Sequence, residues 1–525
     1  MAVLRCGHVQ SCALYGIEGI LVDIEVTILP GLPAFEIVGL GDSAVRESRN
    51  RVHAALKNNG FDFPSSRVTA SYAPAWLRKE GSGFDLPLAL AILIASGQLK
   101  KPLVPVCAFG ELSLTGEVRR VPGTICRAAA CQEKQLPAVL IPAGNAAEAR
   151  PVMARNCLPV AHLRDAVKYL ATGQLDEAVL ASDSSQMELP ANGKQTPAEK
   201  SVRDIGTIIG QQKAVRALQI AAAGRHNLLL LGSPGCGKTS LAETLPGLLP
   251  PLQMEEAVLV SRIYSASGLL KDGDGLVRQR PFRSPHHTIS RTGMVGGGAI
   301  PTPGEISLAH QGVLFLDEMT EFHSETLDLL RQPLEDQVVR LVRLHHKMVY
   351  PADFMLVGAA NPCRCGEYLE PNAVCRCTAD SVRQHLDRLS GPLLDRIDLV
   401  VEMTRLSAEE LRRSAVATPG TLSRTAEMAL GIRQCWQKQL DRCQKMGLPF
   451  YSNGRMNSQD LADFLIIPES ITAFAADTSA RLGLSVRGFH KMLRVARTIA
   501  DLDHCDAVSM KHMAEAFQYR LRRPE

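Results

Sequence analysis

The amino-acid sequence predicts an α/β protein organised around a nucleotide-binding domain with a mainly parallel sheet. The phosphate-loop pattern G-x-x-x-x-G-K-[ST] occupies Gly232–Thr239, between an apolar stretch and the helical pattern Ser240–Leu249. A second apolar run, Val313–Leu316, ends in Asp317 and Glu318. Strands and helices alternate around these motifs, which is typical of a parallel sheet covered by helices on both faces.

Length and composition indicate a soluble multidomain protein without a membrane segment. At 525 residues the chain is long enough for about three domains. Its 46% hydrophobic and 21% charged residues are ordinary for a globular protein. No run approaches the ~20 apolar residues of a membrane span, and the N-terminus lacks a signal-peptide layout, so we expect a cytoplasmic protein. The net charge of +4 excludes a global basic field, and any DNA contact must come from local patches.

The N-terminal segment, residues 1–175, is expected to form a mixed α/β domain. Residue patterns predict strands at Ile20–Leu29, Val68–Tyr72 and Ala138–Ile141, and helices at Ser43–Asn59 and Leu86–Ser96. Residues 176–200 are polar and rich in residues that interrupt helices and strands, and we interpret them as a linker.

Beyond the linker, residues 201–405 form the predicted nucleotide-binding core, which includes a strand at Phe354–Ala360. Residues 406–525 have mostly helical spacing and are expected to form a lid domain. Its predicted helices are Ala408–Thr418, Thr421–Lys445, Asn457–Ile466, Pro468–Leu482, Val486–Leu502 and Ser509–Leu521.

The phosphate loop is the expected binding site for ATP and Mg²⁺. Its glycines let backbone N–H groups face the phosphates. Lys238 is expected to contact the outer phosphates and Thr239 to ligate Mg²⁺. The complete predicted cradle is Gly232, Ser233, Pro234, Gly235, Cys236, Gly237, Lys238, Thr239 and Ser240. At the tip of the second strand, Asp317 is expected to organise Mg²⁺ while Glu318 polarises the attacking water.

Three further polar residues are candidates for the same site. Asn361 follows a predicted strand and suits the positioning of water or the terminal phosphate, although Asn-Pro is also a common turn. Arg396 is either an arginine finger for a neighbouring subunit, which requires an oligomeric ring, or a surface residue paired with Asp395 or Asp398. Arg487 begins a predicted helix, and it either reaches nucleotide from the lid or is an ordinary exposed arginine.

Several longer motifs show a family resemblance. They are Ala221–Leu229, Pro281–Ser290, Gly296–Gly298, Pro303–Gly312, Asn361–Gly366 and Ser390–Asp398, together with Leu32–Leu40 and Lys79–Pro87 near the N-terminus. In these motifs the chain resembles AAA+ ATPases of the magnesium-chelatase/MCM branch, and the YifB/ComM group in particular. The resemblance implies that Asn361 is sensor 1, Arg396 the finger and Arg487 sensor 2. Proteins similar to ComM are hexameric DNA motors that drive branch migration during natural transformation.

Two insertions are candidates for DNA contact. The resemblance lays residues 335–362 on the MCM pre-sensor hairpin and places Arg343 where that family has a pore-loop lysine. Arg340, His345, His346 and Lys347 surround it, a local basic cluster suited to phosphate contacts that do not read sequence. The alternative is a solvated hairpin face. The second insertion, Arg280–Ser290, offers Arg283, His286 and His287; its two histidines are alternatively a packing pair or, as a weaker option, a metal site.

Four of the 14 cysteines fall close together, at Cys363, Cys365, Cys375 and Cys377. Four thiolates on one short loop suit a structural, tetrahedral zinc ion, although the C-x-C spacing is tighter than the usual C-x₂-C. Reduced free thiols and a redox switch remain the alternatives. The other cysteines are dispersed and are expected to be mostly buried or inert thiols.

The N-terminal domain resembles the Lon-type proteolytic fold, which is related to a ribosomal-protein-like fold. The Ser–Lys dyad of active Lon proteases aligns with Gly83 and Ile125, so both catalytic groups are missing. Ser82 and Lys79 lie nearby in sequence and leave a rearranged dyad as a remote option. A role in DNA engagement or ring assembly is the expectation instead.

The sequence therefore favours an oligomeric, ATP-hydrolysing DNA translocase or branch-migration helicase, in the form of a homohexameric ring. One alternative is a chelatase-type motor that remodels a protein partner. A second alternative is an ATP-dependent, Lon-like protease, which the residues at positions 83 and 125 disfavour.

Overall fold

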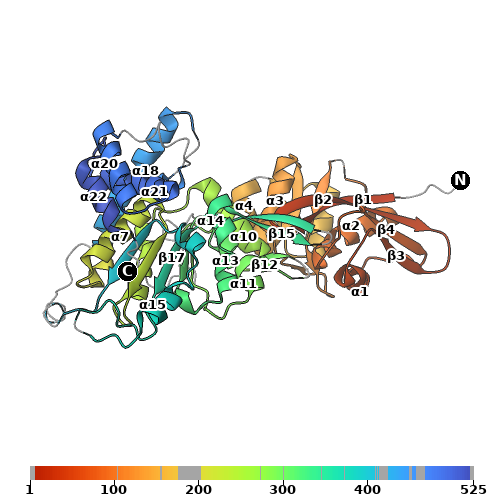
Figure 1. The fold of residues 1–525 in the computed structure, drawn as a ribbon. Coiled ribbons are helices and arrows are strands. Elements are labelled where there is room, and N and C mark those ends of the chain that lie inside the picture. Colours follow the sequence, from red (N-terminus) through yellow and green to blue (C-terminus); the bar gives the residue numbers. More distant parts are fainter. Residues whose placement is uncertain are drawn as a thin grey trace. The chain divides into compact units, whose positions relative to one another are not determined.

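The computed structural model describes two compact units (Figure 1). Unit 1 comprises Met1–Ala198 and Met254–Val277, and unit 2 comprises Glu199–Gln253 and Arg278–Glu525. The described residues are 6–102, 104–153, 156–174, 203–271, 273–298, 301–343, 346–371, 373–407, 410, 412, 424–448, 452–456 and 467–520. The predicted linker 176–200 and the predicted helix Asn457–Ile466 lie outside them, as does most of Ala408–Thr418.

Unit 1 is built on a seven-stranded mixed sheet with the order β3-β4-β2-β1-β5-β8-β9. The strands are β1 (Cys6–Tyr15), β2 (Glu18–Leu29), β3 (Ala34–Val38), β4 (Arg67–Ala73), β5 (Val106–Ala108), β8 (Ala138–Pro142) and β9 (Cys157–Val160). β1, β2 and β4 pair antiparallel, whereas β5, β8 and β9 run parallel. The predicted strands at residues 20–29, 68–72 and 138–141 are confirmed.

Among the described residues, the helices that accompany this sheet are α1 (Ser43–Asn58), α2 (Asp85–Ser96), α3 (Thr124–Glu133), α4 (Ala146–Met153) and α5 (Leu163–Thr172). α2 is buried along nearly its whole length because its side chains are almost all apolar, which confirms the helix predicted there. α1 buries one stripe that includes Val45, Val52 and Leu56 and keeps its basic residues mostly outward.

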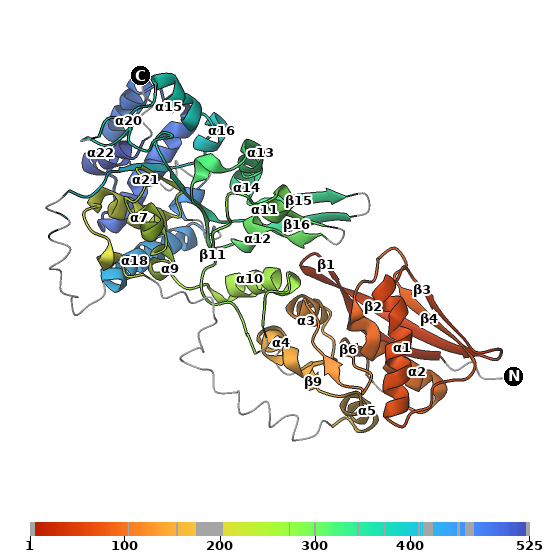
Figure 2. The same ribbon diagram turned by 90° about the horizontal axis from the view of Figure 1, so that it is seen from below.

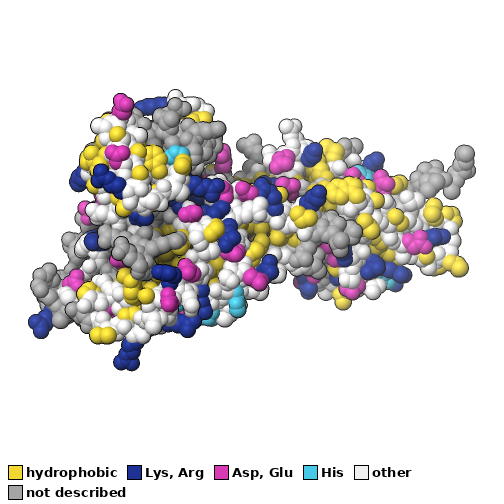
Figure 3. All heavy atoms as spheres, in the orientation of Figure 1, with side chains coloured by type: hydrophobic (Ala, Val, Ile, Leu, Met, Phe, Trp, Pro, Cys, Tyr) yellow, Lys and Arg dark blue, Asp and Glu magenta, His cyan; other side chains and the backbone are white. Residues whose placement is uncertain are grey.

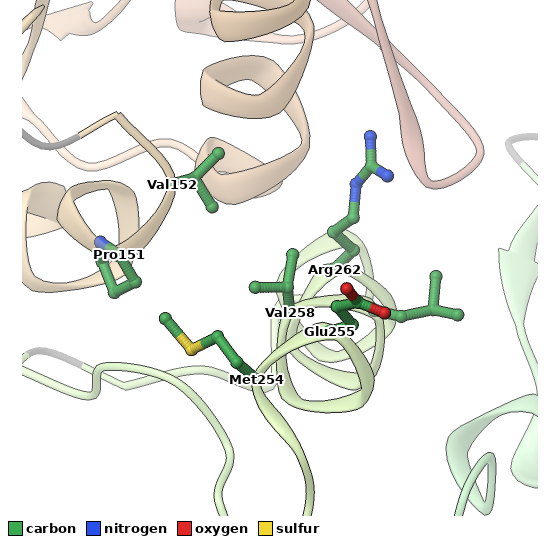
Figure 4. Close-up of a pocket in the computed structure, with 7 residues that line it drawn as sticks. Pro151, Val152, Met254, Glu255, Val258 and Arg262 are labelled. Atoms are coloured by element: carbon green, nitrogen blue, oxygen red, sulfur yellow. The ribbon is translucent and has the colours of Figure 1, made fainter. Parts of the chain in front are cut away.

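One further helix of unit 1 comes from a distant part of the sequence. α10 (Met254–Ala266) follows the phosphate loop in the chain, yet it packs on α3 and α4. The Gly123 N–H donates to the Ser265 carbonyl at 3.1 Å, and the Ser265 hydroxyl donates to the Glu148 carboxylate. The two stretches of sequence thus share one core. A shallow, mainly apolar pocket lies between α4 and α10, lined by Pro151, Val152, Met254, Glu255, Val258, Leu259 and Arg262 (Figure 4).

Unit 2 contains the five-stranded sheet β11-β14-β17-β10-β18, in which every pairing is parallel. Its strands are β11 (Phe282–Arg283), β14 (Val313–Leu316), β17 (Met355–Ala360), β10 (Leu228–Gly232) and β18 (Leu399–Met403). The predicted parallel sheet is confirmed. The predicted helix Ser240–Leu249 is instead split into α8 (Lys238–Ala242) and α9 (Leu245–Leu248). Pro246 favours this break, because proline has no N–H to continue a helix.

Helices from the C-terminal part of the chain pack beside α7 (Gln212–Gly224) in the core of unit 2 (Figure 2). They are α18 (Arg424–Lys445), α20 (Glu469–Arg481), α21 (Val486–Leu502) and α22 (Met510–Gln518). The predicted helices at these positions are confirmed. Of the helices that the structure describes, none has the length and apolar character needed to cross a membrane.

A two-stranded hairpin extends from unit 2 (Figure 2). β15 (Val338–Arg343) and β16 (His346–Pro351) pair antiparallel, with Arg343 opposite His346. The Tyr350 hydroxyl anchors its base by donating to the Pro301 carbonyl at 2.6 Å. Leu344 and His345 at the tip lie outside the described residues, as do the side chains of Arg343 and His346. Lys347 and Arg340 are exposed, and Arg340 bonds to Asp336.

Candidate nucleotide-binding and hydrolysis site

The carboxyl ends of three neighbouring strands bring the predicted nucleotide residues together. β10 pairs in parallel with β17, and β17 pairs in parallel with β14. The phosphate loop follows β10, Asp317 follows β14 and Asn361 follows β17. Ligands of open parallel sheets bind at this edge, where polar side chains meet beyond the strands.

Glycines give the phosphate loop its shape. Gly235 and Gly237 have φ values of 81° and 94°, in the left-handed region that other residues rarely adopt. At Gly232 the constraint is space, because a Cβ atom would collide with the carbonyl oxygen of Met403 on β18. The loop can therefore turn sharply and leave its backbone uncovered.

Lys238 lies at the centre of this group. Its ammonium donates to the carbonyls of Gly232 at 2.7 Å and Ser233 at 3.0 Å, and to Oδ1 of Asn361 at 3.1 Å. Burial lowers the pKa of Lys238 from its usual value. The predicted sensor and the predicted phosphate-binding lysine are thus in direct contact across two strands.

Thr239 and Asp317 form a hard-oxygen pair of the kind that Mg²⁺ prefers. The Thr239 hydroxyl donates to Oδ2 of Asp317 at 2.7 Å, and Oδ1 of Asp317 accepts the N–H of Glu318 at 2.9 Å. A magnesium ion with its waters and phosphate ligands would need both oxygens on the same side of the loop. The residues present fit that ion.

Glu318 is held in an unusual backbone conformation, with φ at 49°. Its side chain is 58% exposed, and one carboxylate oxygen lies 3.5 Å from Nδ1 of His287. His287 was predicted as a DNA contact, and its position against Glu318 was not anticipated from the sequence. Its ring also packs on that of His286 with centroids 4.1 Å apart, as in the packing-pair alternative.

Arg396 and Arg487 meet at one carboxylate, which the sequence did not indicate. Both guanidinium groups donate to Glu335, the contact from Arg487 measuring 3.2 Å. Glu335 lies on α14 (Arg331–Asp336), directly before the hairpin. Asp398, one of the partners considered for Arg396, instead accepts the backbone N–H of Asn227 at 2.9 Å.

Arg283 forms a salt bridge within unit 2. Its guanidinium makes a bidentate pair with Glu305, with both N–O distances 2.7 Å. Such pairing is geometrically specific and occupies the two N–H groups on one edge of the guanidinium, which then cannot bind a phosphate at the same time. His286 contacts Thr288 through Nδ1 at 3.0 Å.

The four clustered cysteines converge, as expected for a metal site. Their sulfur atoms all lie within 4.8 Å of one another. The Cys363–Cys365, Cys365–Cys375 and Cys363–Cys375 sulfur separations are 3.3, 3.5 and 3.8 Å. A tetrahedral zinc ion with Zn–S bonds of ~2.3 Å has S–S edges of about 3.8 Å. The sulfurs are too far apart for disulfides, and their separations are compatible with a bound zinc ion.

Asn227 is an organising residue that sequence reasoning missed. Its side chain accepts the Leu356 N–H at 2.9 Å and donates to the Arg396 carbonyl at 2.7 Å. It therefore ties the starts of β10 and β17 to the backbone of the predicted finger. A polar amide immediately before the wholly apolar strand β10 was the available signal.

The Lon-like positions of unit 1 do not assemble a catalytic dyad. The Lys79 ammonium is fully buried and donates to the carbonyls of Tyr72, at 2.8 Å, and Pro74. The Ser82 hydroxyl donates to Glu111. Gly83 and Ile125 are buried, and neither side chain supplies a nucleophile or a base.

Matches to protein families cover most of the chain. Residues 204–411 match the family "Magnesium chelatase, subunit ChlI", residues 24–145 match "Subunit ChlI of Mg-chelatase", and residues 423–520 match the C-terminal region of the same subunit.

Individual relatives match nearly the full length of the chain. YifB of Escherichia coli, itself uncharacterized, is 40% identical over 516 residues, covering 98% of this chain and 96% of its own. The competence protein ComM of Haemophilus influenzae is 40% identical over 515 residues, covering 98% of this chain and 97% of its own. Lon protease 2 of Bacillus subtilis is 27% identical over 270 residues, covering 43% and 46% of the two chains. The chain belongs to the YifB/ComM group of magnesium-chelatase-like AAA+ proteins.

Proposed function

We propose that the protein is an ATP-hydrolysing motor that translocates on DNA. The observation that carries the ATPase part is the convergence of Lys238, Thr239, Asp317 and Asn361 at the carboxyl edge of one parallel sheet. Phosphoryl transfer needs positioning and charge stabilisation more than covalent chemistry, and this set supplies both.

Each residue has a defined part in hydrolysis. The phosphate loop and Lys238 bind the phosphates, and Thr239 and Asp317 hold Mg²⁺, which neutralises charge on the reacting phosphates when bound. Glu318, exposed at the strand tip, orients and polarises the attacking water. Asn361 contacts the terminal phosphate and helps to position it beside Lys238, with which Asn361 shares a hydrogen bond.

Assembly into a ring, a hexamer by family resemblance, completes the site. Arg396 and Arg487 act on phosphates, Arg396 on those of a neighbouring subunit. Among the described residues, neither guanidinium bonds to the phosphate loop of its own chain, and both occupy the Glu335 carboxylate. A carboxylate presents the same paired oxygen acceptors as a phosphate, which supports this assignment.

DNA contact is assigned to the β15–β16 hairpin through Arg343 and Lys347. The projecting hairpin and exposed Lys347 support the assignment, whereas the bidentate pairing of Arg283 favours a structural role for that residue. Lys and Arg side chains are interspersed with Asp and Glu over the face seen in Figure 3. A local element must therefore supply the electrostatic contacts with DNA phosphates.

The test is steady-state ATP hydrolysis with and without single-stranded and forked DNA. Stimulation by DNA supports the translocase. An active enzyme that ignores DNA contradicts that part of the proposal and makes the chelatase-type remodelling of a protein partner the function to pursue. Proteolysis is not proposed, since Lys79 and Ser82 each bond to other groups.

We also propose that Cys363, Cys365, Cys375 and Cys377 bind a structural zinc ion. The spacing of their sulfurs supports it. The ion would contribute to folding rather than to hydrolysis.

A further inference from the structure

The cysteine loop, defined here as residues 363–377, adjoins the nucleotide site in sequence and in space. It begins two positions after Asn361, whose side chain contacts Lys238. Among its described residues none belongs to a helix or strand. A segment of this kind has few constraints of its own, so a metal bound by four of its side chains would fix its shape.

The first link from the cysteine loop to the phosphate loop is a close steric contact. Gly366, directly after Cys365, has a φ of 81°. A Cβ atom at this position would lie 3.0 Å from Cγ of Pro234 and closer still to its Cδ. The backbone of the cysteine loop is therefore pressed against the phosphate loop, and only glycine permits the approach.

The second link is a hydrogen-bonded chain. The hydroxyl of Ser233 in the phosphate loop donates to the carboxylate of Glu370. The same carboxylate accepts the N–H of Arg405 at 2.9 Å, and the Arg405 guanidinium donates to Glu367 at 2.6 Å. Arg405 lies just beyond β18, the strand that pairs with β10. The cysteine loop thus bridges the phosphate loop and the end of the neighbouring strand.

We infer that zinc in the cysteine cluster clamps the cysteine loop onto Ser233 and Pro234, so that nucleotide affinity depends on the metal. The inference rests on the proposed nucleotide and zinc sites and goes beyond both, because it makes the zinc site a determinant of phosphate-loop geometry. Preorganised backbone donors bind an anion more tightly than donors that must be ordered on binding.

Three variants of the full-length chain test the clamp. Cys375→Ser removes one zinc ligand. Gly366→Ala keeps all four ligands but places a methyl group against Pro234. Cys505→Ser, at an exposed thiol outside the cluster, is the matched control. Zinc content is measured by atomic emission, and affinity by titration with a fluorescent ADP analogue.

The wild-type chain is expected to carry one zinc ion. Cys375→Ser should lose zinc and bind the analogue about tenfold more weakly, because the loop must then be ordered on binding at a cost of about 1.4 kcal/mol. Gly366→Ala should retain zinc yet weaken binding by a similar factor, which separates the clamp from general folding. Cys505→Ser should match the wild type in both measurements.

Wild-type affinity in zinc-free Cys375→Ser, or in zinc-loaded Gly366→Ala, would overturn the clamp while leaving the proposed function intact. A purified wild-type chain without zinc would overturn it as well. A wild-type chain that holds zinc but binds no nucleotide would overturn the proposed function and the clamp with it.

Discussion

Unit 1 and unit 2 each bury a lysine whose ammonium donates to two backbone carbonyls, yet only one of these lysines belongs to a reaction site. Lys79 bonds to the carbonyls of Tyr72 and Pro74, and Lys238 to those of Gly232 and Ser233. Burial lowers the pKa of both. Judged by the lysine alone, the two units are alike.

The surroundings distinguish them. Lys238 also reaches Asn361, beside a glycine loop and the Thr239–Asp317 pair, so its own partners can be exchanged for phosphate oxygens. Lys79 is 0% exposed, compared with 8% for Lys238, and Ser82 bonds to Glu111. A buried lysine marks a site only when uncovered backbone and convergent oxygens accompany it.

The largest expected effect separates the acids of the two units. Glu318→Gln should lower the rate of ATP hydrolysis by about 10²–10⁴-fold while nucleotide still binds, because the general base is lost. Glu111→Gln in unit 1 is the counterpart and should leave hydrolysis unchanged. Steady-state phosphate release measures both. Normal turnover in Glu318→Gln would remove that residue from the mechanism.

The two lysines come next. Lys238→Ala should weaken nucleotide binding by about 3 kcal/mol, roughly a hundredfold, since the charged phosphate contact disappears. Lys79→Met should leave nucleotide affinity intact. It should also leave two buried carbonyls without a hydrogen-bond donor and so lower the stability of unit 1 by about 1–3 kcal/mol. Titration with a fluorescent nucleotide and calorimetric unfolding measure the pair. A loss of nucleotide affinity in Lys79→Met would show that Lys79 also contributes to nucleotide binding.

Acid should act on the two units differently. The buried histidines among the described residues, His226, His310, His385 and His512, all belong to unit 2. Burial lowers the pKa of His310 to about 4 and also lowers those of His385 and His512. The His310 ring stays neutral in the folded state while the unfolded state takes up a proton below about pH 6.5, so the free energy of unfolding falls as the pH drops from about 6.5 toward 4.

For His310 alone the expected loss between pH 7 and pH 5 is about 2 kcal/mol. Hydrogen exchange corrected for intrinsic rates should show unit 2 opening more readily at pH 5, with unit 1 less affected. In His310→Gln the acid response of unit 2 should be smaller. If acid destabilised the two units equally, the buried histidines of unit 2 would not be the cause.

The smallest effect concerns DNA. Lys347→Ala on the hairpin should reduce DNA stimulation of hydrolysis about threefold with basal hydrolysis unchanged, since one phosphate contact is lost. Lys57→Ala, at an exposed position at the end of α1, is the matched change in unit 1. A larger loss of DNA stimulation in Lys57→Ala than in Lys347→Ala would place the DNA-binding surface on unit 1.

Much of the ATP site followed from local patterns. The phosphate loop and the apolar strands before Asp317 and Asn361 have short-range signatures, and parallel packing then brings their ends together. What the sequence did not reveal depends on long-range pairing. Glu335 binds Arg396 and Arg487 from far along the chain, and α10 packs in unit 1 although it follows the phosphate loop.

The sequence also failed to predict some local features of unit 2. The apolar spacing of Ser240–Leu249 predicted one helix, but Pro246 divides it. The sequence makes His287 a candidate for DNA contact or for a histidine packing pair, and only the folded chain places it beside Glu318. Asn227 had a sequence signal in its position before β10, whereas the partners of its side chain, Leu356 and Arg396, come from distant segments.

ATP hydrolysis measured with and without single-stranded and forked DNA, with Glu318→Gln as the inactive control, decides whether the protein is a DNA-stimulated ATPase. We expect DNA to stimulate hydrolysis by the wild-type chain, and we expect hydrolysis to be nearly absent in the variant. Hydrolysis by the wild-type chain at the same rate with and without DNA would contradict this expectation.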